Sequence, residues 1–385
     1  MWTLLRKKRK NNSPIPPAAV SYDNPASAQP LKSRLNDNKR ELQNFFAQCS
    51  DIVFREFTGK GYRLLLVYLD TMVDKKLINE SILHAVKSER LSAEAGGEQL
   101  LKQLADKVVE NCEVKQLGSF KQALDAILSG DTVVFTESVS TAFAVSSQGY
   151  DFRPVEEPLT ESVIRGPREG FTENLNTNIS LVRRRLKTPD LKFEAYSLGE
   201  RTNTRVVIAY LKEVANPEIL NEAKNRLQRI KIDSILESAY IEELIEDTPF
   251  TVFPQLEATE RPDKVAAGLL EGRIAIIVDG TPFSLLLPTT MFQLLQSSED
   301  YYQRFPSAIL IRLIRFGFLN LALLAPAIYV AITTFHPEML PTPLLISIMA
   351  AREGVPFPTA IEVAVIEFTF EALREAGVRL PKPVG

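Results

Sequence analysis

The run Phe316–Phe335 (FGFLNLALLAPAIYVAITTF) constrains this chain more than any other feature. It is twenty residues long and contains no charged side chain. At about 1.5 Å of rise per residue, a helix of this length spans the ~30 Å hydrocarbon core of a bilayer. A buried core helix of a soluble protein is the alternative, but core helices seldom continue so far without a charge. The run therefore predicts a membrane span after a long, mostly soluble region.

Basic residues predict the orientation of this span. Arg304, Arg312 and Arg315 precede it, whereas the connection His336–Pro343 contains neither Lys nor Arg. Because basic residues concentrate on the cytoplasmic side, we expect the N-terminal region in the cytoplasm. Arg312 and Arg315 are expected to extend toward the lipid headgroups. The first ten residues, MWTLLRKKRK, lack the apolar core of a secretory signal.

The chain begins with a strongly basic segment. Residues 1–40 hold nine Lys/Arg against two Asp/Glu, a balance of +7, so the net charge of −3 leaves −10 for the rest. The segment is rich in Pro, Asn and Ser, which predicts a disordered basic tail over residues 1–35. Contact with anionic membrane lipid and a solvated tail without a partner are equally compatible with this composition.

The soluble region is predicted to form two similar α/β subdomains, residues 36–150 and 151–300. In the first, Arg63–Asp70 is an apolar run of strand length, and Ile78–Ser88 has helical spacing. Ser119–Leu128 is a predicted helix with Ser119 as its N-cap and Gly130 just beyond its end. Three more strands are expected: Glu113–Leu117, Thr132–Glu137 and Thr141–Ser146. Alternating strands and helices favour α/β layering.

The second subdomain repeats the order of the first. Arg205–Lys212 follows Arg63–Asp70 at an offset of 142 residues (205 minus 63), and Gly272 follows Gly130 at the same offset. A fixed period indicates a duplicated module, with chance convergence as the alternative. The other repeated segments are Lys264–Leu270, Arg273–Val278 and Thr281–Leu286.

The segment Pro158–Leu191, called here the signature segment, is densely polar. Gly166-Pro167 breaks the backbone, Thr172 is expected to cap the helix that follows, and Pro189 to end it. Basic residues crowd the last turns, where cations suit the helix dipole: Arg183, Arg184, Arg185 and Lys187. An anion or nucleic-acid site and a solvated helix end are both possible. The absence of interleaved aromatic residues favours the solvated end, so we expect no nucleic-acid partner.

The sequence contains no pattern that predicts catalysis. Phosphate-loop, dinucleotide, metalloprotease and serine-hydrolase motifs are absent. The two histidines, His84 and His336, are too far apart for a metal cluster, and Cys49 and Cys112 form no metal-binding pair. We therefore expect no enzyme, no catalytic residue, no cofactor and no metal, and two buried thiols in a reducing compartment.

The membrane region is predicted to cover residues 301–385. Leu344–Ala351 is apolar but too short to span a bilayer, and Thr359–Ala376 reads as an amphipathic helix. This helix either lines an aqueous path or lies flat in the interface. Glu362 and Glu367 lie about 140° apart around it, whereas Glu367 and Glu371 are only about 40° apart. All three are candidate pore residues, with Glu367 and Glu371 on the wet side and Glu362 in a protein contact.

Three segments resemble the A subunit of GerA-type spore germinant receptors: Val163–Glu194, Val278–Pro306 and Arg352–Pro381. The resemblance extends from about Leu35 to the last residue. It implies an integral protein of the spore inner membrane that works with B and C subunits in nutrient-triggered germination and oligomerises into an ion-conducting channel. It also implies structural or assembly roles for the family-signature residues Arg165, Gly166, Pro167, Arg168, Glu169, Phe171, Asn174 and Asn176.

Two further expectations accompany this resemblance. Family members continue past the position of Gly385 with more spans, so the chain is expected to be a C-terminally truncated member. A membrane-anchored cytoplasmic module that binds a small molecule, without channel activity, is the main rival; it predicts a pocket between the two subdomains. A membrane-bound enzyme is the other rival, and it predicts a cleft with converging titratable groups.

Overall fold

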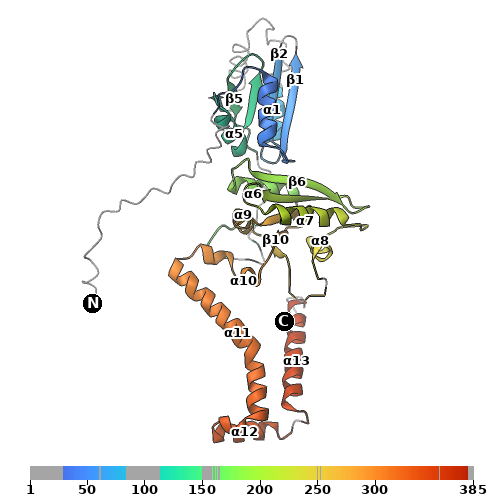
Figure 1. The fold of residues 1–385 in the computed structure, drawn as a ribbon, viewed down its shortest axis with the longest axis vertical. Helices are drawn as coiled ribbons and strands as arrows, with labels where there is room; N and C mark the ends of the chain where they lie inside the picture. The colour runs from blue at the N-terminus through green and yellow to red at the C-terminus, as the bar shows by residue number, and fades with distance from the viewer. Residues whose placement is uncertain are drawn as a thin grey trace, which may run out of the picture. The chain divides into compact units, whose positions relative to one another are not determined.

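The computed structural model divides into two compact units, Met1–Thr290 and Met291–Gly385. It describes residues 29–59, 62–83, 113–149, 158, 161, 163, 165–248, 250–251, 253–354 and 356–379. The first unit contains two sheets with packed helices and the second is helical (Figure 1). This confirms the predicted fold class. The subdomain boundaries predicted from the sequence stay predictions.

The first subdomain is a five-stranded antiparallel sheet with helices. Its strand order is β1-β2-β4-β5-β3. The strands predicted from the sequence correspond to β2, β3, β4 and β5. Its elements in chain order are α1 (Leu35–Phe45), β1 (Ile52–Gly59), β2 (Tyr62–Leu69), α2 (Lys75–Leu77), the π-helical turn η1 (Ile78–Leu83), β3 (Val114–Leu117), α5 (Phe120–Ser129), β4 (Thr132–Thr136) and β5 (Ala142–Val145).

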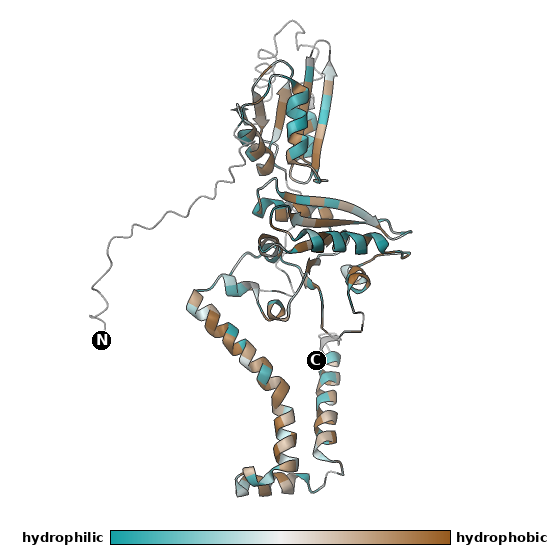
Figure 2. Ribbon diagram, in the orientation of Figure 1, coloured by the Kyte–Doolittle hydropathy of each residue, from teal (hydrophilic) through white to brown (hydrophobic). Residues whose placement is uncertain are grey.

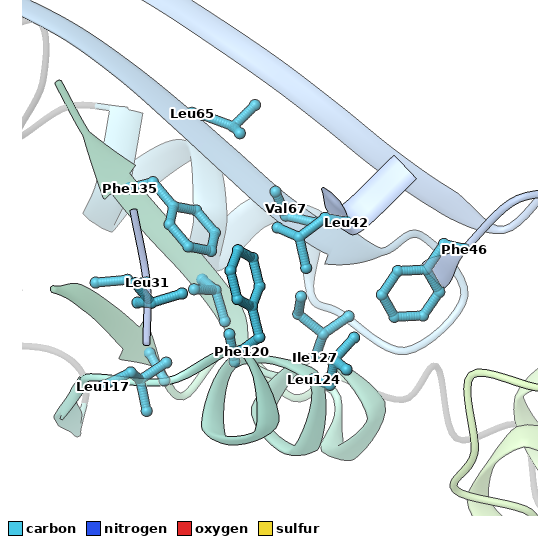
Figure 3. Close-up of a cluster of buried hydrophobic side chains, with 14 of the residues drawn as sticks. Leu31, Leu42, Phe46, Leu65, Val67, Leu117, Phe120, Leu124, Ile127 and Phe135 are labelled. Carbon is cyan, nitrogen blue, oxygen red and sulfur yellow. The ribbon is translucent and has the colours of Figure 1, made fainter. Parts of the chain in front are cut away.

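Helices α1 and α5 cover one face of this sheet. Leu42 of α1 and Phe120 of α5 pack with Leu65, Val67 and Phe135, which lie on that face of β2 and β4 (Figure 3). Alternate residues of the same strands point to the opposite face and are buried there as well. Burial on both faces explains why β2 reads as an unbroken apolar run. The second face carries Leu64, Leu66, Tyr68, Val73, Ile78, Val134 and Val145.

The second subdomain has an equivalent sheet, and helices pack on both of its faces. Helices α6 and α9 pack on one face of its sheet, and α7 and α8 on the other. The strand order is β6-β7-β9-β10-β8, again antiparallel throughout. Its elements are α6 (Leu175–Arg185), β6 (Leu191–Leu198), β7 (Thr204–Leu211), α7 (Pro217–Arg229), α8 (Ser238–Ile245), β8 (Glu257–Thr259), α9 (Pro262–Leu270), β9 (Ile274–Val278) and β10 (Ser284–Leu287).

The two sheets confirm the repeat that the sequence predicted. Their strand orders are equivalent, and β2, β4 and β5 are each followed by their counterparts 142 residues later (204 minus 62, 274 minus 132 and 284 minus 142). Ser119 caps α5, and Gly130 and Gly272 follow α5 and α9 with left-handed φ angles of 93° and 87°. A glycine tolerates this conformation without strain.

A buried asparagine repeats as well. In α1, the side chain of Asn38 accepts from the amide of Lys32 at 2.9 Å and donates to the carbonyl of Lys32 at 2.6 Å. In α6, Asn178 makes the same two bonds with Thr172, at 2.8 and 2.6 Å. Each asparagine satisfies backbone groups of the chain entering its helix.

Some local expectations were wrong. The N-cap of α6 is Asn174, whose side chain accepts from the amides of Asn176 and Thr177; Thr172 lies two residues earlier and accepts from the amide of Asn174. Residues 29–34 were placed in the tail, but Leu31 is buried in the first core. The helix expected over Ile78–Ser88 is described only as far as η1. His84 and Cys112 lie outside the described residues.

The second unit is helical; α11 is mostly apolar, whereas α13 mixes apolar and charged residues (Figure 2). Among the described residues, α11 alone is long and apolar enough to cross a membrane; it has 31 residues and contains Pro326. The apolar run Phe316–Phe335 forms its C-terminal two thirds. The helical elements are α10 (Met291–Leu294), the 3₁₀ turn η2 (Ser298–Tyr301), α11 (Phe305–Phe335), the 3₁₀ turn η3 (Pro337–Met339), α12 (Thr342–Arg352) and α13 (Thr359–Arg379).

The arginines before the apolar run are bound within this unit. Arg312 and Arg315 both contact the carboxylate of Asp300, at 3.3 and 2.9 Å, where the sequence had predicted contact with headgroups. Burial raises the pKa of Asp300, but hydrogen bonds from Arg315 and from the backbone of Ser297 outweigh it, so the pKa is lowered. Asp300 therefore stays ionised and anchors the start of α11.

Candidate functional site at the junction of the two sheets

A buried ion pair joins the two subdomains. Asp51, just before β1, and Arg183, in the last turn of α6, have side chains that are 1% and 0% exposed. The Arg183 guanidinium donates to both Asp51 oxygens, with N–O distances of 2.9 to 3.1 Å. It also donates to the carbonyls of Thr188 and Leu191 and lies 4.7 Å from the ring centre of Phe193. Every donor on Arg183 is therefore used, as a buried charge requires.

Backbone contacts extend this joint along β6. The amide of Ser50 donates to the carbonyl of Phe193 at 2.9 Å, so the loop before β1 bonds to the edge of the second sheet. Lys192 donates to the carbonyl of Phe45 at 2.8 Å. Burial lowers the pKa of Lys192 and raises the pKa of the Cys49 thiol. Cys49 is therefore a protonated, weakly nucleophilic thiol, which argues against covalent chemistry at this joint.

The family-signature residues make their contacts mainly inside the second subdomain. Phe171 is buried in the core beside α6, and its amide donates to the carbonyl of Glu260 at 2.7 Å. The carbonyl of Pro167 accepts from Arg261 at 2.8 Å, and Glu169 lies 2.7 Å from Arg185. Asn174 caps α6 and bonds Asn176, as described above. Arg165, Gly166 and Arg168 are exposed.

A polar cavity of about 380 Å³ lies between residues of the two subdomains. It is bordered by the loop after β2 and by one side of α6, so both subdomains contribute to its wall. Cations, carboxylates and amides line it together, which suits a small zwitterionic or polyhydroxylated molecule. Its polar lining includes Asp70, Asp74, Lys75, Lys76, Asn176 and Ser180.

The structure also places the three candidate pore residues of α13. Glu362 contacts Arg352 at the end of α12, with an N–O distance of 3.0 Å, so these two helices are tied at their connection. Glu367 is exposed, and Glu371 is exposed with Arg374 3.2 Å away. Glu362 thus differs from Glu367 and Glu371 in its burial and in its contact with a second helix. The pore roles of all three stay predictions.

Sequence reasoning missed the central residues of the junction. Arg183 was noted only as part of a basic helix end, and Asp51 was not singled out. The two are 132 residues apart in the chain, so no local pattern joins them. Among the described residues, no group of three or more His, Cys, Asp and Glu side chains is placed to hold a metal ion.

Comparison with known proteins settles the family. The model of the Bacillus/Clostridium GerA spore germination protein matches residues 40–385. The chain belongs to the GerA family of spore germination proteins. This GerA-family chain is 42% identical to spore germination protein KA of Bacillus subtilis over 392 residues, which cover 99% of this chain and 71% of that protein. It is 45% identical to the uncharacterized membrane protein YfkQ of the same organism over 368 residues, 93% of this chain and 69% of YfkQ.

A solved structure supports the fold. The crystal structure of the N-terminal domain of the A subunit of the Bacillus megaterium spore germinant receptor GerK3 is similar, with a TM-score of 0.56 and 34% sequence identity. The match covers 69% of this GerA-family chain and 98% of the GerK3 domain. The GerA family comprises spore germination proteins and is not a known enzyme family. These relatives support a role in spore germination and an association with a membrane.

Proposed function

We propose that this GerA-family chain is the A subunit of a nutrient germinant receptor in the spore inner membrane, where it oligomerises into an ion-conducting channel. It works with B and C subunits, and its N-terminal unit faces the spore core. One observation carries the membrane part of this proposal: only 6% of the most apolar stretch of α11 is buried within the chain. An apolar surface that the chain leaves bare needs lipid or other subunits to cover it.

Helix α13 supplies the charged residues that an ion-conducting path requires. Phe368 and Phe370 are exposed, as is Glu367 between the apolar positions of the same helix. Carboxylates in an apolar helix are costly unless they face water or a partner. Glu362 is partly buried against Arg352, whereas Glu367 and Glu371 are both exposed, the latter beside Arg374, so we assign Glu367 and Glu371 to the wet stripe. Repeated around an oligomer, these residues would form a ring that attracts cations.

Potassium efflux from germinating spores tests the proposal. Spores carry Glu367→Gln in the receptor. Glu338→Gln, at an exposed position in the 3₁₀ turn η3, serves as the matched control. We expect slower efflux with Glu367→Gln, normal efflux with the control, and equal receptor abundance in both. Normal efflux from Glu367→Gln spores at normal abundance would reject the pore role of this stripe and favour a helix lying in the interface.

A second candidate function rests on the polar cavity at the junction. We infer that the chain could serve as a membrane-anchored module that binds a small molecule between its two subdomains, without conducting ions. The mixed charges of the cavity favour an amino acid or a sugar. A ligand at 100 times its Kd would stabilise the N-terminal unit by about 2.7 kcal/mol. Thermal unfolding with single amino acids and sugars checks this, and an unchanged Tm with all of them speaks against it.

A further inference from the structure

Four charged side chains form a continuous network in the second subdomain, called here the buried charge network: Glu257 and Arg273, which are buried, and Lys264 and Glu161, which are partly buried. Lys264 of α9 lies 2.9 Å from Glu161 and 2.8 Å from Glu257 of β8. Glu257 lies 2.7 Å from Arg273, the residue before β9. Glu257 and Arg273 are 5% and 7% exposed, so these charges interact with little screening by water.

One end of the buried charge network holds the signature segment. Arg261 donates to the carbonyl of Glu161 at 3.0 Å and to the carbonyl of Pro167 at 2.8 Å. The hydroxyl of Thr259 donates to the carboxylate of Glu161. Arg261 thus links the backbone at Glu161 to the Gly166-Pro167 turn.

The other end holds the last residues of the N-terminal unit, Pro288–Thr290, called here the exit segment. Arg273 donates to the carbonyl of Pro288 at 3.0 Å and to the hydroxyl of Thr289 at 2.8 Å. The chain then enters the helical unit at Met291. Arg273 therefore fixes the backbone that leads toward the predicted membrane helices.

The first subdomain provides an internal comparison. Its counterparts 142 residues earlier are Lys115 for Glu257, Gln122 for Lys264 and Asp131 for Arg273. The sheet register supports this equivalence, because Glu257 pairs with Leu286 as Lys115 pairs with Ala144. Lys115 is 67% exposed and contacts Glu113. The buried charge network is thus present in the subdomain that is followed by the helical unit and replaced by other residue types in the first.

The side chains of the buried charge network stabilise one another in their ionised forms. Burial alone would lower the pKa of Lys264, but the carboxylates of Glu161 and Glu257 outweigh it and the pKa is raised. Lys264 therefore stays charged at neutral pH. Glu257 is the counter-ion of both Lys264 and Arg273, so removing Glu257 takes the carboxylate partner from Arg273, and removing Arg273 leaves Glu257 with Lys264 alone. A folded protein relieves such a change in buried charge balance by moving the remaining side chains.

We infer that Glu257 and Arg273 are positioning residues. Through the buried charge network they hold the exit segment and the signature segment in a fixed relation, so that a displacement of one segment changes the position of the other. The inference goes beyond the proposed function and does not depend on channel activity. It concerns the N-terminal unit alone, for which the separately solved domain of the GerK3 A subunit is a precedent.

Hydrogen–deuterium exchange of residues 29–290 tests this inference with a change at the exit end. In Arg273→Met, we expect the amides of residues 165–172 to exchange at least tenfold faster than in the wild type. The amide of Phe171 is the most informative probe, because it is bonded to Glu260 in the fold. The strand β2 serves as an internal reference, since a general loss of stability would accelerate its exchange as well.

Lys224→Met is the matched control. Lys224 forms a half-buried ion pair with Glu194 at 2.7 Å in the same subdomain, outside the buried charge network. We expect unchanged exchange at residues 165–172 in this variant. If Arg273→Met alters exchange only next to residue 273, with residues 165–172 as in the wild type, the inference is wrong. Should Arg273→Met fail to fold, Glu257→Gln keeps the side-chain shape, removes the charge and carries the same two outcomes.

Discussion

At the scale of single residues, Arg183 decides how the two halves of the N-terminal unit meet. Its guanidinium is fully buried, and its carboxylate partner comes from the other subdomain. A lone charge at this depth would be costly, whereas a bidentate pair with satisfied neighbours is tolerated. The sequence showed an arginine-rich helix end but not its partner, because a contact between residues 132 apart leaves no periodic trace.

Asp51→Ala should destabilise the N-terminal unit by about 3–5 kcal/mol, because it leaves Arg183 buried without a counter-ion. Urea unfolding of residues 29–290 measures this change. Asp233→Ala is the control: Asp233 and Arg201 form a pair in which both side chains are mostly exposed, and such pairs contribute at most about 1 kcal/mol. If Asp51→Ala lowers the free energy of unfolding no more than the control does, the junction ion pair does not stabilise the N-terminal unit.

At the scale of elements, the strands buried on both faces were predictable, whereas of the edge strands only β3 was predicted and β1, β6 and β8 were not. The central strands β2 and β7 read as continuous apolar runs and were found. Strands β1 and β6 lie at sheet edges and mix charged with apolar residues, such as Arg55, Glu56 and Glu194, so their pattern resembles a loop. The cap of α6 was misplaced because Thr172, Glu173 and Asn174 offer more than one capping side chain within three residues.

The start of α8 gives a pH prediction. Glu237 caps this helix, and its carboxylate accepts from the amide of Ala239 and the hydroxyls of Ser238 and Thr281. Burial raises the pKa of Glu237, but these hydrogen bonds outweigh it and lower the pKa below its ordinary value of 4.5. A lowered folded-state pKa stabilises the fold fully above the unfolded pKa, and this stabilisation is lost as pH falls through the folded pKa.

Glu237→Gln should therefore cost about 1 kcal/mol at pH 7 and progressively less below pH ~4.5, where the wild-type carboxyl is protonated too. Urea midpoints between pH 7 and pH 3.5 follow the difference. Glu243→Gln, on the exposed side of the same helix, should show a small and constant difference. If Glu237→Gln lowers the free energy of unfolding as much at the lowest pH as at pH 7, the ionised carboxylate does not have the proposed capping role.

At the scale of the whole molecule, the repeat and the apolar helix were the parts best predicted from the sequence. A fixed offset of 142 residues and a charge-free run of twenty residues can both be recognised in the sequence without knowing which residues are in contact. The buried charge network was not predicted, and a pocket between the subdomains was expected only under the rival binding-module interpretation. The residues that line both depend on how distant elements pack, which no local sequence pattern records. The helical unit was located, but its orientation remains a prediction from the basic residues around Arg304.

Labelling of protoplasts with an impermeant thiol reagent checks that orientation. A cysteine at position 13 (Ser13→Cys) should be labelled only after the membrane is opened, because the basic flank predicts a cytoplasmic N-terminus. A cysteine at position 336 (His336→Cys), just past the apolar helix, should be labelled in closed protoplasts. Both variants are made with Cys49 and Cys112 replaced by Ser. Labelling of position 13 in closed protoplasts would reverse the proposed topology.

The ion pair between Asp51 and Arg183 also bears on how the chain emerges from the ribosome. Asp51 is synthesised first, and its cation follows 132 residues later. At roughly 5–20 residues per second, that interval lasts about 7–26 seconds. During this time the carboxylate has no guanidinium, so its surroundings must stay hydrated until α6 has been made. The nascent first subdomain therefore cannot close its junction face until translation of the second is well under way.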